Sequence, residues 1–331
     1  MAALTPPPLD NSLGVISIGV VVSAAIYGLT CLQTYNYFQQ QAKEAEKDSV
    51  LLRASIVVLW IIESLHSACI AHALYFYSVS HYGDYASLQR AVWSIILPTG
   101  LTSLVGSIVQ ACFAWRVYIM SDKNKPLVSL IALGSIIQLV TGWVMTGLGF
   151  KYRLFADLGH FKALITTSWT TTAVTDVVIT ISLCYYFHNR RSGIKRCHLS
   201  YFRKSNIDTY QSTDNLIQKL IIYTINGGVL CSVGAIVALL TYLTMPENLV
   251  NIAVNFILGK AYSNSLLSSL NARTNLREAN ERGFSLDFVD SGPAFASQQP
   301  SGGVAVTTVF ESNAGNQKGI YAQGHKIAHV V

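Results

Sequence analysis

Hydrophobic residues are concentrated in seven long runs, separated by short polar segments. A helix that crosses a bilayer needs roughly 18–20 apolar residues, and each run is long enough. The runs are apolar around most of their circumference, unlike helices on the surface of a soluble bundle, and they lack the alternation of membrane β-barrel strands. We therefore expect an all-α integral membrane bundle of seven transmembrane helices. The expected spans are residues 13–38, 51–79, 91–120, 127–150, 161–187, 215–245 and 249–270.

Composition supports the same class of protein. The 331 residues are 51% hydrophobic and 12% charged, with a mean hydropathy of +0.39, whereas soluble domains usually carry about a quarter charged residues. No Lys or Arg precedes Lys43. The first run therefore lacks the basic start of a cleavable signal peptide, and we expect the mature protein to keep it.

The distribution of Lys and Arg predicts the orientation of the bundle. Most of the 23 Lys and Arg residues lie in or beside the first, third and fifth connections and the C-terminal tail. Basic residues stay preferentially in the cytoplasm. This predicts an N-terminus outside, with residues 1–12 as a short extracytoplasmic tail, and a cytoplasmic C-terminus. The other connections hold only Arg90, Lys151, Arg153 and Lys162.

The fifth connection, residues 188–214, is strongly basic and predicts contact with anionic lipids of the inner leaflet. A topology anchor without a partner is an equal alternative, and a third is docking of a cytosolic partner there and on the tail. In the tail, residues 271–281 have the spacing of a short interfacial helix. The rest of residues 271–331 is rich in Ser, Gly, Gln and Pro and is expected to be mostly disordered. The predicted lipid contacts are Arg190, Arg191, Lys195, Arg196, Arg203 and Lys204.

Three ionisable residues lie near the middle of predicted spans: Glu63, Asp176 and Lys260. Each costs roughly 2.5–3.5 kcal/mol at the bilayer centre, so each should face the bundle interior. Lys260 is expected to pair with Glu63 or with Asp176. The faces that carry them predict a polar cavity at mid-depth, which is either a ligand- or proton-linked site or a network that fixes helix packing. The candidate site is Glu63, His66, Thr172, Asp176, Lys260 and Asn264.

Signatures of catalysis and of cofactor binding are incomplete. Glu63 and His66 form a single Glu-x-x-His element, whereas di-iron bundles need two, and the sequence has no P-loop, G-x-S-x-G or CxxC motif. Lys260 is placed like the retinal lysine of microbial rhodopsins, but residues 91–120 contain no acidic counter-ion. We expect no catalytic residues, metal, cofactor or nucleic-acid partner, and no enzyme activity.

The last two predicted spans carry a specific resemblance. The stretches KLIIYTINGG (219–228), GKAYSNSLL (259–267) and LNAR (270–273) resemble a domain of unknown function in mushroom-type fungal membrane proteins. Residues 28–34 and 176–186 are similar to the same family. The resemblance places the domain at about residues 171–274 and implies a seven-helix fungal membrane protein, but it implies no activity.

The favoured function is a receptor-like sensor of a small ligand, reported through the basic fifth connection and the tail. The architecture is similar to that of G-protein-coupled receptors, although Arg116 at the end of the third span has no acidic residue before it and the seventh lacks N-P-x-x-Y. The receptor-like function is favoured only by analogy with the fold of these receptors. The alternatives are a transporter or channel that uses Glu63, Asp176 and Lys260 as a relay, and a membrane scaffold. The sequence leaves open whether the membrane is the plasma membrane or an endomembrane.

Overall fold

The computed structural model describes residues 13–43, 48–84, 86–154, 159–201, 227–244 and 249–290. These residues are almost entirely helical, and the β-structure among them is one isolated bridge between Arg90 and Leu154. The all-α prediction is confirmed for this part of the chain. Residues up to Leu286 form one unit and the remainder a second; the description below concerns the first.

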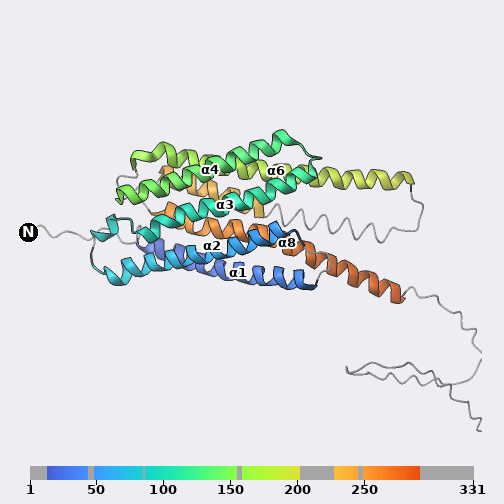
Figure 1. The fold of residues 1–331 in the computed structure, drawn as a ribbon, viewed down its shortest axis with the longest axis horizontal. Helices are drawn as coiled ribbons and strands as arrows, with labels where there is room; N and C mark the ends of the chain where they lie inside the picture. Colours follow the sequence, from blue (N-terminus) through green and yellow to red (C-terminus); the bar gives the residue numbers. More distant parts are fainter. Residues whose placement is uncertain are drawn as a thin grey trace, which may run out of the picture. The chain divides into compact units, whose positions relative to one another are not determined.

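Helices α1 to α4 follow the predicted hydrophobic runs closely, whereas α6 and α8 are longer than predicted; Figure 1 shows the helices. Short 3-10 turns lie at Ser87–Gln89 (η3) and Gly159–Phe161 (η4), and a π-helical turn, Phe76–Ser80 (η2), continues α2. Of the predicted sixth span, residues 215–226 and residue 245 lie outside the described residues. The helices are α1 (Val15–Lys43), α2 (Val50–Tyr75), α3 (Trp93–Met120), α4 (Lys125–Tyr152), α6 (Lys162–Tyr201), the helix Gly227–Thr244 and α8 (Val250–Asp290).

Local chemistry explains where several helices begin and end. The side chain of Ser49 accepts a hydrogen bond from the backbone N–H of Leu52 at the start of α2, and Asn124 does the same for Leu127 at the start of α4. Such caps satisfy backbone donors that the helix itself leaves free. At the other end of α4, Arg153 adopts a left-handed conformation with φ of 50°, which stops the helix.

Six helices in the described residues are long and apolar enough to cross a membrane: α1, α2 with η2, α3, α4, the first part of α6 and Gly227–Thr244. The chain is therefore a multi-pass membrane protein. The seventh predicted span falls in α8, where Asn251, Asn255, Lys260 and Asn264 interrupt the apolar run. The count of seven and the orientation of the termini remain predictions.

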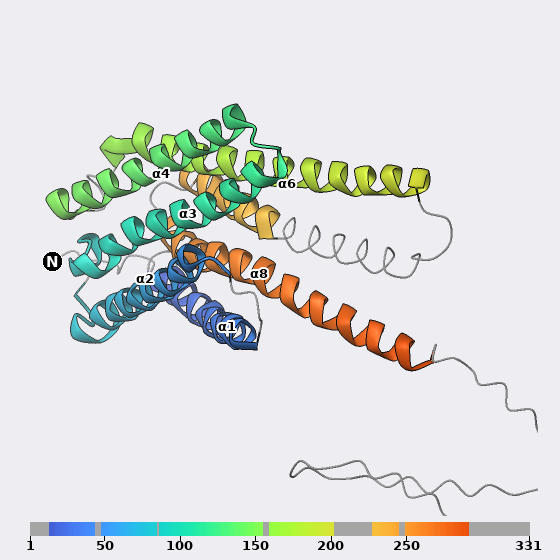
Figure 2. The ribbon, with the colours of Figure 1, turned by 45° about the vertical axis from the view of Figure 1, so that its right-hand side comes forward.

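Polar residues are tolerated in α8 because its first half lies among the other helices (Figure 2). Ser23 of α1 donates to the carbonyl of Phe256, and Asn251 donates to the carbonyl of Ala238 in Gly227–Thr244. Phe256 and Leu266 are fully buried. This half of α8 is thus shielded from lipid, so its apolar content can be lower than that of an outer helix.

Two predicted boundaries are wrong. The connection expected to begin at residue 188 is helical as far as Tyr201, because α6 continues through it. The separate interfacial helix expected at 271–281 is part of an unbroken α8. Both helices continue because neither stretch contains a Pro that would break the helix. A segment can also be helical outside the bilayer, since helix propensity does not depend on lipid.

The extension of α6 carries four of the six basic residues expected at the inner leaflet, Arg190, Arg191, Lys195 and Arg196. The other two, Arg203 and Lys204, lie outside the described residues, as do the tails at 1–12 and 291–331. Contact of these residues with anionic lipids stays a prediction.

Candidate functional site

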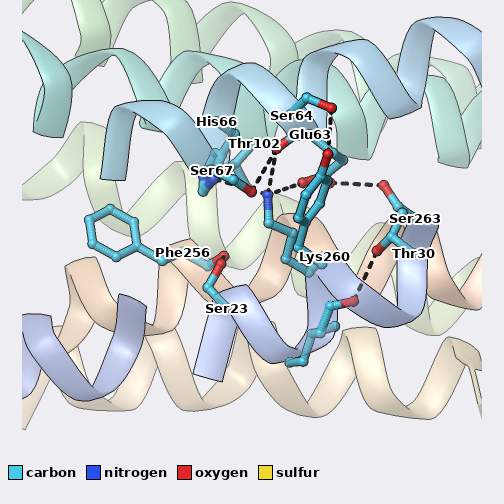
Figure 3. A network of polar contacts seen from close by, with 12 residues as sticks. Ser23, Thr30, Glu63, Ser64, His66, Ser67, Thr102, Phe256, Lys260 and Ser263 are labelled. Carbon is cyan, nitrogen blue, oxygen red and sulfur yellow. Dashed lines mark hydrogen bonds and ion pairs between the residues drawn. The ribbon is translucent and has the colours of Figure 1, made fainter. Parts of the chain in front are cut away.

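Lys260 forms a buried ion pair with Glu63, so α8 is joined to α2 at this point (Figure 3). Its ammonium nitrogen Nζ also lies 3.0 Å from the carbonyl oxygen of Glu63 and 3.2 Å from Nδ1 of His66. An ammonium group has three N–H donors. All three therefore have an acceptor, and Lys260 is fully buried at 0% exposure.

The remaining atoms of this first cluster are also satisfied. The second carboxylate oxygen of Glu63, Oε1, accepts a hydrogen bond of 2.8 Å from Ser263, and Nε2 of His66 lies 3.3 Å from the hydroxyl of Thr102 in α3. If Nδ1 of His66 accepts from Lys260, the imidazole is neutral and Nε2 carries its proton. The first cluster is thus neutral overall, and it fastens α2, α3 and α8 together.

Asp176 is the centre of a second cluster, built from α3, α4, α6 and α8. One of its carboxylate oxygens accepts from the hydroxyl of Tyr262, and the other accepts from Nε2 of Gln110 at 2.9 Å. Gln110 also donates to Gln138 at 2.9 Å and accepts from Ser135 at 2.7 Å. Within the described part of the chain, no Lys, Arg or His forms an ion pair with Asp176.

The structure therefore separates the three charges that the sequence groups together. Lys260 and Tyr262 are two positions apart on α8, which turns their side chains about 200° from each other around the helix axis. Lys260 faces α2, and Tyr262 faces α6. The expected single cavity at mid-depth, shared by Glu63, Asp176 and Lys260, is replaced by two clusters on opposite sides of α8.

The other two predicted site residues belong to neither cluster. The hydroxyl of Thr172 donates to the backbone carbonyl of Ser168 in its own helix at 2.8 Å. Asn264 donates to the hydroxyl of Thr30 at 2.9 Å and so ties α8 to α1. Both residues support packing in the positions where the structure places them.

The residues that sequence reasoning missed are neutral. Gln110, Gln138 and Tyr262 carry no charge, so a search for ionisable groups inside spans passes over them. Each is nonetheless buried, at 1%, 5% and 2% exposure. The amides of Gln110 and Gln138 in the middle of apolar runs were the available signal, because a buried amide needs partners.

One part of the chain matches a known protein family. Residues 172–275 match a family of unknown function (DUF6534). The domain of unknown function expected at about 171–274 is thereby confirmed, while a fungal origin stays a prediction. No curated protein and no solved structure matches the chain.

The DUF6534 segment supplies one side of each cluster. It contains Asp176, Lys260 and Tyr262, whereas Glu63 and Gln110 lie outside it. Both clusters are therefore completed only when the DUF6534 helices pack against the N-terminal helices. The matched family is one of unknown function, so the match assigns no chemistry to these residues.

A groove of about 540 Å³ lies between α3 and α4, on a face that includes strongly exposed apolar side chains. Trp115 is 64% exposed and Ile136 is 57% exposed. Ser135 also lines the groove, and it is the residue that donates to Gln110. A series of hydrogen bonds thus runs from the groove through Ser135 and Gln110 to Asp176 of the DUF6534 segment. The lining residues are Ser107, Ala111, Ala114, Trp115, Tyr118, Val128, Ala132, Ser135, Ile136 and Leu139.

Proposed function

We propose that the protein is a receptor-like membrane sensor, and that its ligand is a small lipophilic molecule bound in the α3–α4 groove. The supporting observation is the series of hydrogen bonds from Ser135 in the groove through Gln110 and Asp176 to Tyr262 on α8. A ligand that displaces Ser135 changes the partners of Gln110, and that change reaches α8 within two further hydrogen bonds.

The groove has the properties of a site for an apolar ligand. Ligand pockets commonly measure about 300–1,000 Å³ and have mainly apolar walls with a few polar groups that orient the ligand. The groove, at about 540 Å³, has the hydroxyls of Ser107, Tyr118 and Ser135 among apolar side chains. Because its rim includes exposed apolar residues in a membrane protein, the ligand would arrive laterally from the lipid.

The helices that meet at Asp176 and Tyr262 also provide an output. α6 and α8 both continue past the rest of the bundle at the same end (Figure 1). In the predicted orientation, with seven spans and an outside N-terminus, this is the cytoplasmic end. A ligand that binds two packing states unequally shifts their populations. A shift between α6 and α8 would move their extensions relative to each other.

An ion-coupled transporter is the second candidate. The observation that favours it is the buried carboxylate of Asp176, which has no cationic partner in the described residues; such groups mark ion and proton pathways. Lys260 fits a relay less well, because all three of its N–H donors are engaged by Glu63 and His66. A scaffold would tolerate neutral replacement of both clusters.

Filling the groove tests the sensor proposal. Purified protein in nanodiscs is heated with fatty acids, sterols and isoprenoid alcohols, one class at a time. We expect one class to raise the unfolding temperature, since a ligand at 100 times its Kd stabilises by about 2.7 kcal/mol. Ala132→Trp fills the groove and should abolish the shift. Leu133→Trp is the matched control, because Leu133 is 57% exposed and does not line the groove.

The contrary results separate the alternatives. Stabilisation that survives Ala132→Trp, or the absence of any stabilising class, contradicts a groove ligand. Flux of protons or Na⁺ into liposomes that is lost in Asp176→Asn would favour the transporter instead. Absence of both effects would leave the scaffold.

A further inference from the structure

A second, much smaller cavity lies beside Asp176, between α3, α6, α8 and the helix Gly227–Thr244. Its volume is about 20 Å³. A cavity needs roughly 10–15 Å³ by this measure to hold one water molecule. It therefore has room for one occupant of atomic size and excludes organic ligands, which distinguishes it from the α3–α4 groove.

The hydrogen-bonding groups around Asp176 can accommodate an ionised carboxylate. Gln110 uses Nε2 to donate to both Asp176 and Gln138, and its Oε1 accepts from Ser135, so the orientation of the amide is fixed by three partners. Tyr262 donates to the other oxygen of Asp176. Both carboxylate oxygens are thus acceptors. These donors are neutral, so an ionised Asp176 has no counter-charge among the described residues, and a buried charge in that state is very costly.

Three residues that line the cavity have hydroxyl oxygens with lone pairs available to a ligand. The hydroxyl of Ser265 is buried and has no oxygen or nitrogen partner within the described residues. Its polar neighbour is the thiol of Cys231, which forms only weak hydrogen bonds. Thr180 donates its proton to the carbonyl of Asp176, which leaves its oxygen lone pairs free to accept. Tyr262 likewise keeps lone pairs after it donates to Asp176.

We propose that this cavity binds a single Na⁺ ion, held by Asp176 with the hydroxyl oxygens of Thr180, Tyr262 and Ser265. All four residues line the cavity. Hard cations prefer oxygen ligands such as carboxylates, carbonyls and hydroxyls. One carboxylate balances one monovalent charge, whereas a divalent ion would leave a net positive charge buried. Mg²⁺ also sheds its water reluctantly and usually retains several water ligands, for which the cavity has no room.

The bound ion would join α6 to α8, since Asp176 and Thr180 come from α6 and Tyr262 and Ser265 from α8. It would thus stabilise one packing arrangement of the two helices. The inference does not depend on the sensor role, because binding of Na⁺ is measured on the protein alone, without any groove ligand.

Two measurements on the purified full chain in nanodiscs at pH 8 test the site. The first is the binding of radioactive ²²Na⁺. The second is thermal unfolding in NaCl or in choline chloride at equal ionic strength. We expect saturable ²²Na⁺ binding and a higher unfolding temperature in NaCl for the wild type. Asp176→Asn should remove both effects. Ser265→Ala, which keeps the carboxylate, should raise the Na⁺ concentration at half-saturation about tenfold, the usual cost of a lost polar contact.

Thr172→Val is the matched control. Thr172 is buried one helical turn from Asp176 on α6, and it does not line the cavity; its Na⁺ response should equal that of the wild type. Three results would overturn the proposal: no ²²Na⁺ binding by the wild type, an equal response to NaCl and choline chloride, or binding retained by Asp176→Asn. The second would indicate that Asp176 is protonated or that a water molecule occupies the cavity. If Asp176→Asn does not fold, an unchanged half-saturation in Ser265→Ala overturns the proposal by itself.

Discussion

Lys260→Met is expected to destabilise the protein by about 3–5 kcal/mol, because it leaves the charge of Glu63 buried without a partner. Glu63 and Lys260 are both fully buried. The double variant Glu63→Gln/Lys260→Met should recover most of the loss, since neutral replacement of a whole buried pair is often tolerated. Denaturant titration of the purified variants in detergent measures the difference in their free energies of unfolding.

Lys162→Met provides the control for loss of a lysine alone. Lys162 is exposed at the start of α6, so its replacement should change stability by less than about 0.5 kcal/mol. Equal stability of Lys260→Met and the double variant would show that Glu63 and Lys260 do not interact.

Gly19→Val is expected to cost about 1–3 kcal/mol or more, the range for overpacking of a tightly packed interior. A Cβ at position 19 would lie 2.8 Å from Cβ of Ala253 and 3.0 Å from its backbone Cα. No side-chain rotation can relieve a contact with backbone, so α1 and α8 would have to separate. Thermal unfolding in nanodiscs reports the loss.

The same helix supplies the control for Gly19. A Cβ at Gly28 would meet nothing within 4 Å, so Gly28→Val makes the same chemical change without a clash. We expect it to be near neutral. If the two variants lose stability equally, the cost comes from the helix itself, and close packing of α1 against α8 is wrong.

The spans could be predicted from sequence because lipid imposes a simple rule. Apolar runs have to be long enough to cross hydrocarbon, and their ends were predicted to within a few residues for α1 to α4. The rule weakens for α8, where Asn255 and Lys260 are compatible with a membrane interior only because other helices surround them. It fails for the ends of α6 and α8, since residues outside the hydrocarbon can continue a helix.

The partners of the charged residues could not be predicted, because they depend on the arrangement of the helices around α8. Position 260 faces α2 and position 262 faces α6, so a lysine moved by two places would have met Asp176. Sequence spacing fixes which residues of one helix share a face. It contains no information on which neighbouring helix that face meets.

Hydrogen–deuterium exchange in α8 is the most direct test of coupling between the groove and the central helix. Ala132→Trp fills the groove without any ligand, so it imitates an occupied site. We predict that exchange in residues 256–270 changes by about threefold or more, as expected for coupling of about 0.5–2 kcal/mol. The change should be absent in Leu133→Trp and abolished when Gln110→Leu is added. Unchanged exchange in Ala132→Trp, or an equal change in Leu133→Trp, would contradict the proposal that the groove acts on α8 through Gln110 and Asp176.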